Sequence, residues 1–176
     1  EITQSIQGGG RAGSLLATVD HTVTAGGGRL LERLISSPSM DVGLINKRFD
    51  CIQHMLDHPT DADTLREALR QVPDLDRALS RIALDRAGPR DLVSIRSGLT
   101  QASDISMKYN HDALPDLIND ALKTLIGFDE LVALLHNALV DEPPLLSRDG
   151  GFVAAGYDAE LDETRQLRDE GRGIIA

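Results

Sequence analysis

Apolar residues recur at helical spacing along most of this 176-residue chain, and prolines and glycines cut the pattern into short pieces. The longest stripe advances by steps of three and four residues through Val42, Ile45, Phe49, Ile52 and Leu56. Side chains at such steps share one face of an α-helix. Shorter stripes follow within residues 62–72, 75–82, 92–102, 117–125 and 128–139. Because the turns between them are short, we expect a mainly α-helical fold in which neighbouring helices pack as a bundle.

Polar residues stand where several of these helices should begin. Ser14, Thr24 and Asp41 each precede a helical stretch and are typical N-cap residues. The pair His58-Pro59 is expected to end the helix that Asp41 begins. Three glycines at 26–28 would each cost a helix about 1 kcal/mol. Their presence predicts a close approach between this first turn and neighbouring backbone.

Two segments depart from helical spacing and are predicted to be short strands. They are residues 1–7, which are partly alternating, and residues 150–157, an apolar run between glycines. Two lone strands are marginal in water, so we expect them to pair with each other or with a partner segment beside the helical body. Residues 158–176 turn helical and highly charged and are expected to project outward. The chain opens at Glu1 without a methionine, and we expect it to be a piece of something longer.

The glycine-rich stretch "GGGRAGSL", residues 8–15, has the outline of a phosphate-binding loop. Such a loop needs a lysine for the terminal phosphate and an adjacent hydroxyl for magnesium. Ser14 and Leu15 occupy those two positions, so both chemical groups are missing. The second cluster, residues 24–31, also lacks the pair. We interpret the first stretch as a turn in which Ser14 caps the next helix.

Composition excludes several classes of function. The net charge of −10 argues against a surface that grips a phosphate backbone by itself. Aromatic residues make up only 3% of the chain, too few for a base-stacking platform. The lone Cys51 rules out an internal disulfide and is expected to be packed in its helix rather than reactive. No apolar run approaches the ~20 residues needed to span a bilayer.

Few residues suggest catalytic chemistry. His54 and His58 stand one helical turn apart and could hold a metal, but Met55 replaces the glutamate of the zinc-protease motif. The arginines within residues 74–96 alternate with aspartates, which favours salt bridges between helices over a nucleic-acid patch. The residues alone therefore indicate a helical, acidic, non-catalytic module.

Several stretches together resemble one family, the MutS proteins of DNA mismatch repair. The resemblance rests on "DHTVTAGGGRLLERLISSP" (20–38), "INKRFDCIQHML" (45–56), "VPDLDRALSRIALDRAGPRDLVSIRSGL" (72–99) and "EPPLLSRDGGFVAAGYDAELDETRQL" (142–167). Their order and spacing agree with the family across nearly the whole chain. One departure is the stretch 33–35, where many members carry a tryptophan.

The resemblance implies that residues 1–176 are the first segment of the core or lever domain, with 158–176 starting the long helix that leads to a clamp. In the family this domain links a mismatch-reading domain, the clamp and an ATPase domain. No catalytic, cofactor-binding or metal-binding residue is expected in this segment. The parent protein is expected to be a cytoplasmic, mismatch-dependent ATPase that uses ATP and Mg²⁺. It is expected to form a homodimer, to act on mismatched duplex DNA with MutL-type proteins and to have no membrane contact.

The expected role is mechanical, because stiff helices would couple nucleotide state to DNA grip. We predict two joints between helices, made by Asp20, Thr24 and Arg29 at one and by Asp74, Arg77, Arg81 and Arg90 at the other. The plainer alternative is that these residues only stabilise the fold. Three other functions stay open: a protein-interaction scaffold with an acidic face, a metal-dependent enzyme built on His54 and His58, and a MutS paralogue acting in recombination.

Overall fold

The computed structural model describes residues 1–6, 8–109 and 113–175, with side chains described as far as residue 170. Within these residues the chain forms nine α-helices and one 3-10 helix, η1 (Ser147–Asp149). The helices are α1 (Leu15–Val19), α2 (Ala25–Ser36), α3 (Val42–Asp57), α4 (Pro59–Arg70), α5 (Leu75–Ala83), α6 (Pro89–Tyr109), α7 (Asp116–Lys123), α8 (Asp129–Ala138) and α9 (Ala159–Ile175). The predicted mainly helical fold is confirmed.

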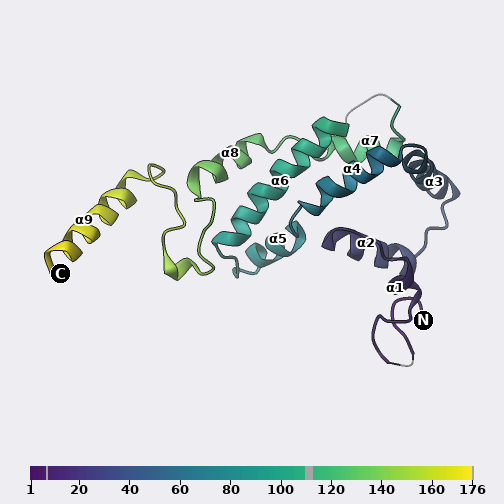
Figure 1. The fold of residues 1–176 in the computed structure, drawn as a ribbon, viewed down its shortest axis with the longest axis horizontal. Coiled ribbons are helices and arrows are strands. Elements are labelled where there is room, and N and C mark those ends of the chain that lie inside the picture. Colours follow the sequence, from purple (N-terminus) through teal and green to yellow (C-terminus); the bar gives the residue numbers. More distant parts are fainter. Residues whose placement is uncertain (7, 110–112, 176) are drawn as a thin grey trace.

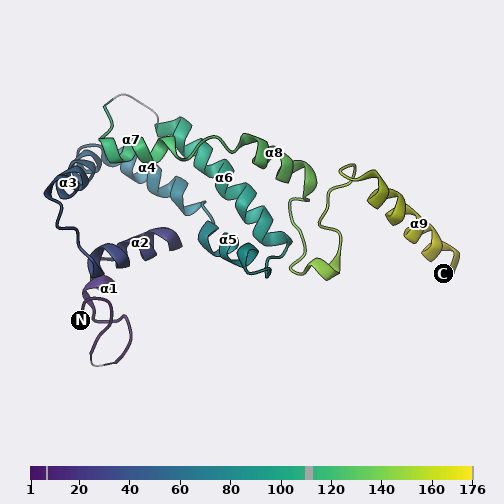
Figure 2. The same cartoon turned by 180° about the vertical axis from the view of Figure 1, so that it is seen from behind.

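The helices are arranged along one long axis (Figures 1 and 2). Helices α4, α6 and α7 form the middle of the body, α5 packs on α6, and α3 lies at one end beside α4 and α7. Helices α1 and α2 form an arm beside the body, and α9 projects at the opposite end. The outward projection predicted for the charged C-terminal helix is therefore confirmed.

The main hydrophobic core lies where α4, α6 and α7 meet. Ile105, Tyr109 and Leu122 are buried there, surrounded by half-buried residues of the same three helices and their connections. Two hydrogen bonds fix the three helices to one another. Ser106 Oγ donates to the carbonyl of Leu122 at 3.0 Å, and Tyr109 Oη donates to the carbonyl of Asp61 at 3.2 Å.

Helices α5 and α6 approach each other closely at Gly98. A Cβ atom added there would lie 2.4 Å from Leu75 Cδ2, far inside van der Waals contact. Ala78 on α5 and Ile95 on α6 are both buried, and the two helices pack against each other. A glycine on α6 is thus what lets the side chain that opens α5 pack against the longer helix.

The structure leaves much apolar surface open. It exposes 12376 Å², whereas a compact monomer of its mass, 19.0 kDa, exposes about 8,400 Å². Part of the difference lies on α3, where Phe49 is 61% exposed and Leu56 is 69% exposed. The helix predicted from the apolar stripe between Val42 and Leu56 is therefore confirmed. Most side chains of that stripe, however, are exposed. Cys51 and Met55, on another face of α3, are half-buried instead.

The predicted N-caps are confirmed. Ser14 accepts a hydrogen bond from the Ala17 amide, Thr24 from Gly27, and Asp41 from two amides of the first turn of α3. The close approach at the glycines of α2 involves side chains instead of backbone. A Cβ atom on Gly27 would lie 2.8 Å from Thr24 Oγ1, the cap of the same helix.

The predicted pair of strands is wrong in the described residues. Residues 1–6 form bends and turns that meet the start of α1, where the Leu16 amide donates to the carbonyl of Ile2 at 2.9 Å. In the second segment only Val153 takes part in pairing, as an isolated antiparallel bridge with Leu139. Positive φ angles at Gly150, Gly151 and Gly156 turn the chain on both sides of this bridge, which prevents a longer strand.

Replacement of Gly98 by alanine should weaken the α5–α6 interface. We expect the free energy of local opening to fall by about 1–2 kcal/mol, because Leu75 must move away from α6. Amide hydrogen exchange in α5 measures this opening. Gly26→Ala in α2 is the matched control, since a Cβ atom there would lie 4.0 Å from Arg29 Nη2 and alanine favours a helix by up to ~1 kcal/mol. Equal exchange in both variants would contradict the proposed close packing.

Candidate interhelical coupling contacts

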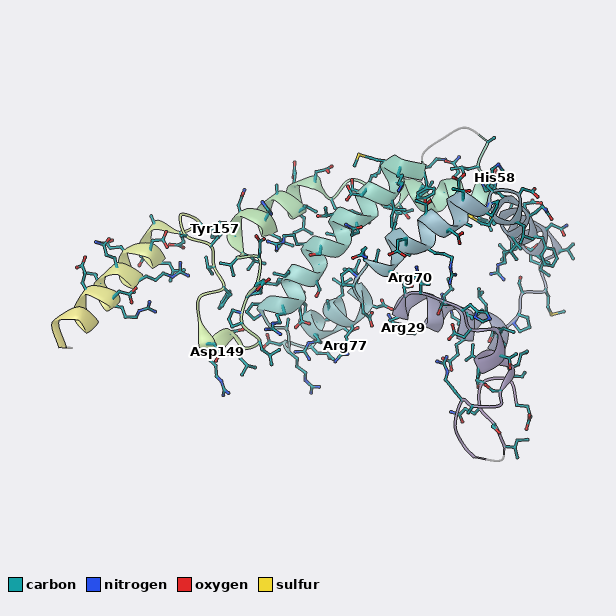
Figure 3. The ribbon with its side chains drawn as sticks, in the orientation of Figure 1. Arg29, His58, Arg70, Arg77, Asp149 and Tyr157 are labelled. Carbon is teal, nitrogen blue, oxygen red and sulfur yellow. The ribbon has the colours of Figure 1, made fainter. Side chains whose placement is uncertain are left out.

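Arg29 joins the arm to the body. Its Nη1 donates to Asp74 Oδ2 at 3.0 Å and its Nη2 donates to Asp74 Oδ1 at 2.7 Å, a bidentate contact between residues 45 positions apart. A third hydrogen bond reaches Asp76 Oδ2 at 3.2 Å. Figure 3 shows Arg29 on α2 near the start of α5. A planar guanidinium can donate two parallel hydrogen bonds to one carboxylate, whereas a lysine ammonium cannot form this bidentate contact.

Asp74 has two structural roles at once. It is the N-cap of α5, and its Oδ1 accepts a hydrogen bond from the Arg77 amide at 3.2 Å while also accepting one from Arg29. The hydrogen bonds from Arg29 hold the pKa of Asp74 below its ordinary value, and the bond from the Arg77 amide adds to this, although burial opposes it. The same pairing with Asp74 raises the pKa of Arg29. The start of α5 and the position of α2 therefore depend on one carboxylate.

Arg81 and Asp91 form a second contact, between α5 and α6. Arg81 Nε lies 3.1 Å from Asp91 Oδ1 and 2.9 Å from Oδ2 and donates toward both. Arg81 Nη2 also donates to the carbonyl of Arg86 at 2.6 Å, and Asp91 Oδ2 accepts from the Gly88 amide at 2.7 Å. Burial raises the pKa of Asp91, but the Gly88 amide and Arg81 outweigh burial, so the net shift is downward. This contact closes the turn between the two helices.

Arg90 makes a third contact, between α6 and the segment that leads to α9. Its Nε donates to the carbonyl of Pro143 at 3.1 Å, across 53 positions of sequence. Arg77 and Arg90 line a groove of about 360 Å³ together with Arg81, Asp91 and other residues of α5 and α6. Figure 3 places Arg77 on the same side of the molecule as Arg29.

The residues of the other predicted joint are arranged differently from the prediction. Asp20 stays within the turn between α1 and α2, where it accepts hydrogen bonds from the amide and hydroxyl of Thr22 and lies 3.9 Å from Arg11. The hydroxyl of Thr22 is the main reason why the pKa of Asp20 is lowered. Thr24 caps α2 and lines a surface groove together with Arg29 and Asp74. Arg29 thus connects the two predicted joints to each other.

Arg96 belongs to the arginines of residues 74–96 for which the sequence predicts salt bridges, whereas Arg66 was not singled out. Arg96 on α6 is buried, with its side chain bonded to Leu139 and Asp141, and Arg66 on α4 donates to the carbonyl of His21 at 3.0 Å. A signal for Arg96 was present, because it lies four positions after Leu92 on the apolar side of its helix. For Arg66 no local pattern exists, since its partner is a backbone carbonyl in a turn.

The rings of His54 on α3 and of His58, the residue that follows α3, are stacked. The rings of His54 and His58 lie 4.3 Å apart between centroids, and His58 Nδ1 lies 2.8 Å from the carbonyl of His54. Across the residues that the structure describes, no three His, Cys, Asp or Glu side chains are grouped as metal ligands. Among the same residues, no helix is long and apolar enough to cross a membrane.

The fold and these contacts define a class of protein: an elongated helical domain whose helices are joined near their ends by arginines. Comparison with known proteins gives the family. The family model described as "MutS domain III" matches residues 1–173 of this chain. The chain belongs to this family.

Three similar proteins all bear the name "DNA mismatch repair protein MutS". They come from Cereibacter sphaeroides, Paracoccus denitrificans and a Ruegeria species, with identities of 60%, 57% and 56%. Each match covers 100% of this chain and 20% of the relative. The chain thus spans about a fifth of the length of these curated relatives.

The contact between α2 and α5 should weaken in acid. Because the pKa of Asp74 is lower when folded than when unfolded, its stabilising contribution is complete above about pH 4 and is lost as the pH falls through the folded-state value. Spin labels at positions 33 and 80 would report the distance between α2 and α5. We expect this distance distribution to broaden below about pH 4.

The variant Asp74→Asn should show the broad distribution already at neutral pH and lose most of the acid dependence. Asp76→Asn is the matched control, because this more exposed carboxylate makes only one hydrogen bond to Arg29. A narrow distribution at neutral pH in Asp74→Asn would show that the carboxylate does not hold the arm.

Proposed function

We propose that this chain is a lever segment of a MutS DNA mismatch repair protein, and that it carries conformational change between the parts of that protein that bind nucleotide and DNA. The observation that supports the proposal best is the series of arginine contacts at the helix ends. Arg29 links α2 to α5, Arg81 links α5 to α6, and Arg90 links α6 to the segment before α9. Each contact runs from an arginine side chain on one helix to a carboxylate or a backbone carbonyl of another element.

Such contacts suit a part that must move. A partly exposed ion pair contributes about 0.2–1 kcal/mol, and a bidentate one lies near the upper end of that range. The rigid helices can therefore keep their internal packing while one contact at a time exchanges its partner.

The activities of the whole protein follow as part of the proposal. The names of the relatives support a parent protein that acts on mismatched duplex DNA. We propose that the parent is an ATPase that uses Mg²⁺, forms a homodimer, works with MutL-type proteins and acts in the cytoplasm. The net charge of −10 supports placing the main DNA contacts outside this segment.

Arg29→Met in the full-length protein should change ATP-driven release from DNA. Because this variant removes the bidentate contact between α2 and α5, we expect the release rate to change several-fold. Release can be followed by the fluorescence of a labelled duplex that contains one mismatch. Arg33→Met, which removes an exposed arginine one turn further along α2, is the matched control.

Arg81→Ala tests the second contact in the same assay and should also alter release. If Arg29→Met and Arg81→Ala both released DNA at the rate of the unmodified protein while their helices stayed folded, these arginines would only stabilise the fold. The lever proposal would then be wrong for this series of contacts.

A further inference from the structure

The isolated bridge between Leu139 and Val153 joins the body to the segment that leads into α9. Two backbone hydrogen bonds form it: the Val140 amide donates to the carbonyl of Phe152 at 3.0 Å, and the Ala154 amide donates to the carbonyl of Ala138 at 2.9 Å. Leu139 and Val153 themselves exchange no hydrogen bond. In an antiparallel pair of this type their own carbonyls point away from the partner segment.

Both of these outward carbonyls accept a hydrogen bond from an arginine. Arg96 on α6 donates through Nη1 to the carbonyl of Leu139 at 3.3 Å, and Arg165 on α9 donates through Nη2 to the carbonyl of Val153 at 3.0 Å. The two guanidiniums occupy the places that neighbouring strands would take in a sheet. A row of hydrogen bonds thus runs from α6 through the two bridge residues to α9.

Each arginine is itself held in place. Arg96 is buried, at 8% exposure, and its Nη2 donates to Asp141 Oδ1 at 3.1 Å. Arg165 Nη1 donates to Asp162 Oδ1 at 3.0 Å, on the same helix. Asp162 Oδ2 in turn accepts from the Gly156 amide at 2.6 Å. Each guanidinium therefore binds one bridge carbonyl and one carboxylate.

The bridge depends on these arginines for a physical reason. A single bridge between two extended residues has too few hydrogen bonds to be stable in water by itself. Hydrogen bonds that involve a charged donor are stronger than neutral ones, and the one from Arg96 to the carbonyl of Leu139 is buried. No other pairing in the described part of the segment 140–158 replaces the bridge, because glycines turn the chain on both sides of Val153.

We propose that Arg96 and Arg165 are positioning residues that fix the direction of α9 relative to α6 through this arginine-flanked bridge, the set of Arg96, Leu139, Val153 and Arg165. The two arginines act on the same short pairing from opposite sides, so loss of either one frees α9 from the body. The use of this contact to transmit motion rests on the lever function proposed above. The proposal that the bridge fixes α9 relative to α6 does not depend on the lever function.

Amide hydrogen exchange in the full-length protein tests the inference. In Arg96→Met and in Arg165→Met we expect the amides of Val140 and Ala154 to exchange about tenfold faster, since each variant removes a charge-assisted hydrogen bond from the bridge. Amides in the α5–α6 interface should exchange at unchanged rates. Arg148→Met, an exposed arginine of η1 in the same connecting segment, is the matched control and should leave both bridge amides protected.

The conservative variant Arg165→Lys should recover part of the protection, because an ammonium can still donate to the carbonyl of Val153. Arg165 is half-buried, with 25% of its side chain exposed against 10% for Arg96, so its variants remain informative even if loss of Arg96 unfolds the domain. Protection of both bridge amides that stays unchanged in Arg165→Met would overturn the inference. Acceleration that spreads equally over all core amides would overturn it too, because it would mark a general loss of stability.

DNA release measured on the same variants separates this inference from the lever function. Faster exchange at the bridge together with altered ATP-driven release would support both. Faster exchange with unaltered release would support the fixing of α9 and contradict its use as a lever.

Discussion

The contact of Leu75 with Gly98 sets the geometry on which the other contacts depend. It brings α5 against α6 without an intervening side chain, and α5 begins one residue after Asp74. The position of α5 on α6 therefore determines where the Asp74 carboxylate lies and whether Arg29 on α2 can bind it. At the other end of α5, the same position brings Arg81 to Asp91. A shift of this one helix would change the position of the arm and the closure of the turn together.

The domain is held by a small core and by many polar contacts at its edges. The core at α4, α6 and α7 fixes the middle of the body, but much apolar surface on α3 stays open. Toward the two ends, arginines that donate to carboxylates and carbonyls hold one element to the next. This division gives stiff helices with joints of limited strength between them, which is the physical requirement of a lever.

The sequence predicted local features well and long-range features poorly. Helices and N-caps such as Thr24 and Asp41 depend on neighbours within a few residues, so their pattern is readable. The exposure of the apolar stripe on α3 was not predictable. An apolar residue such as Phe49 is usually expected to be buried, and the sequence alone does not show that it is exposed. The strand predicted at 150–157 failed because positive φ angles at the glycines around Val153 leave room for only one bridge. Arg29 and Asp74 were both singled out, but their pairing across 45 positions needed the structure.

The measurement that tests the lever account most directly is the distance between spin labels at positions 67 on α4 and 137 on α8. Both positions are exposed and lie on opposite parts of the helical body. The labels would be placed in the full-length protein bound to mismatched DNA, with Cys51 replaced by serine, before and after addition of ATP. The account predicts one narrow distance that stays the same while the DNA is released, because the body moves as a unit. A distance that shifts or broadens on addition of ATP would show that the body deforms, and the lever account would be contradicted.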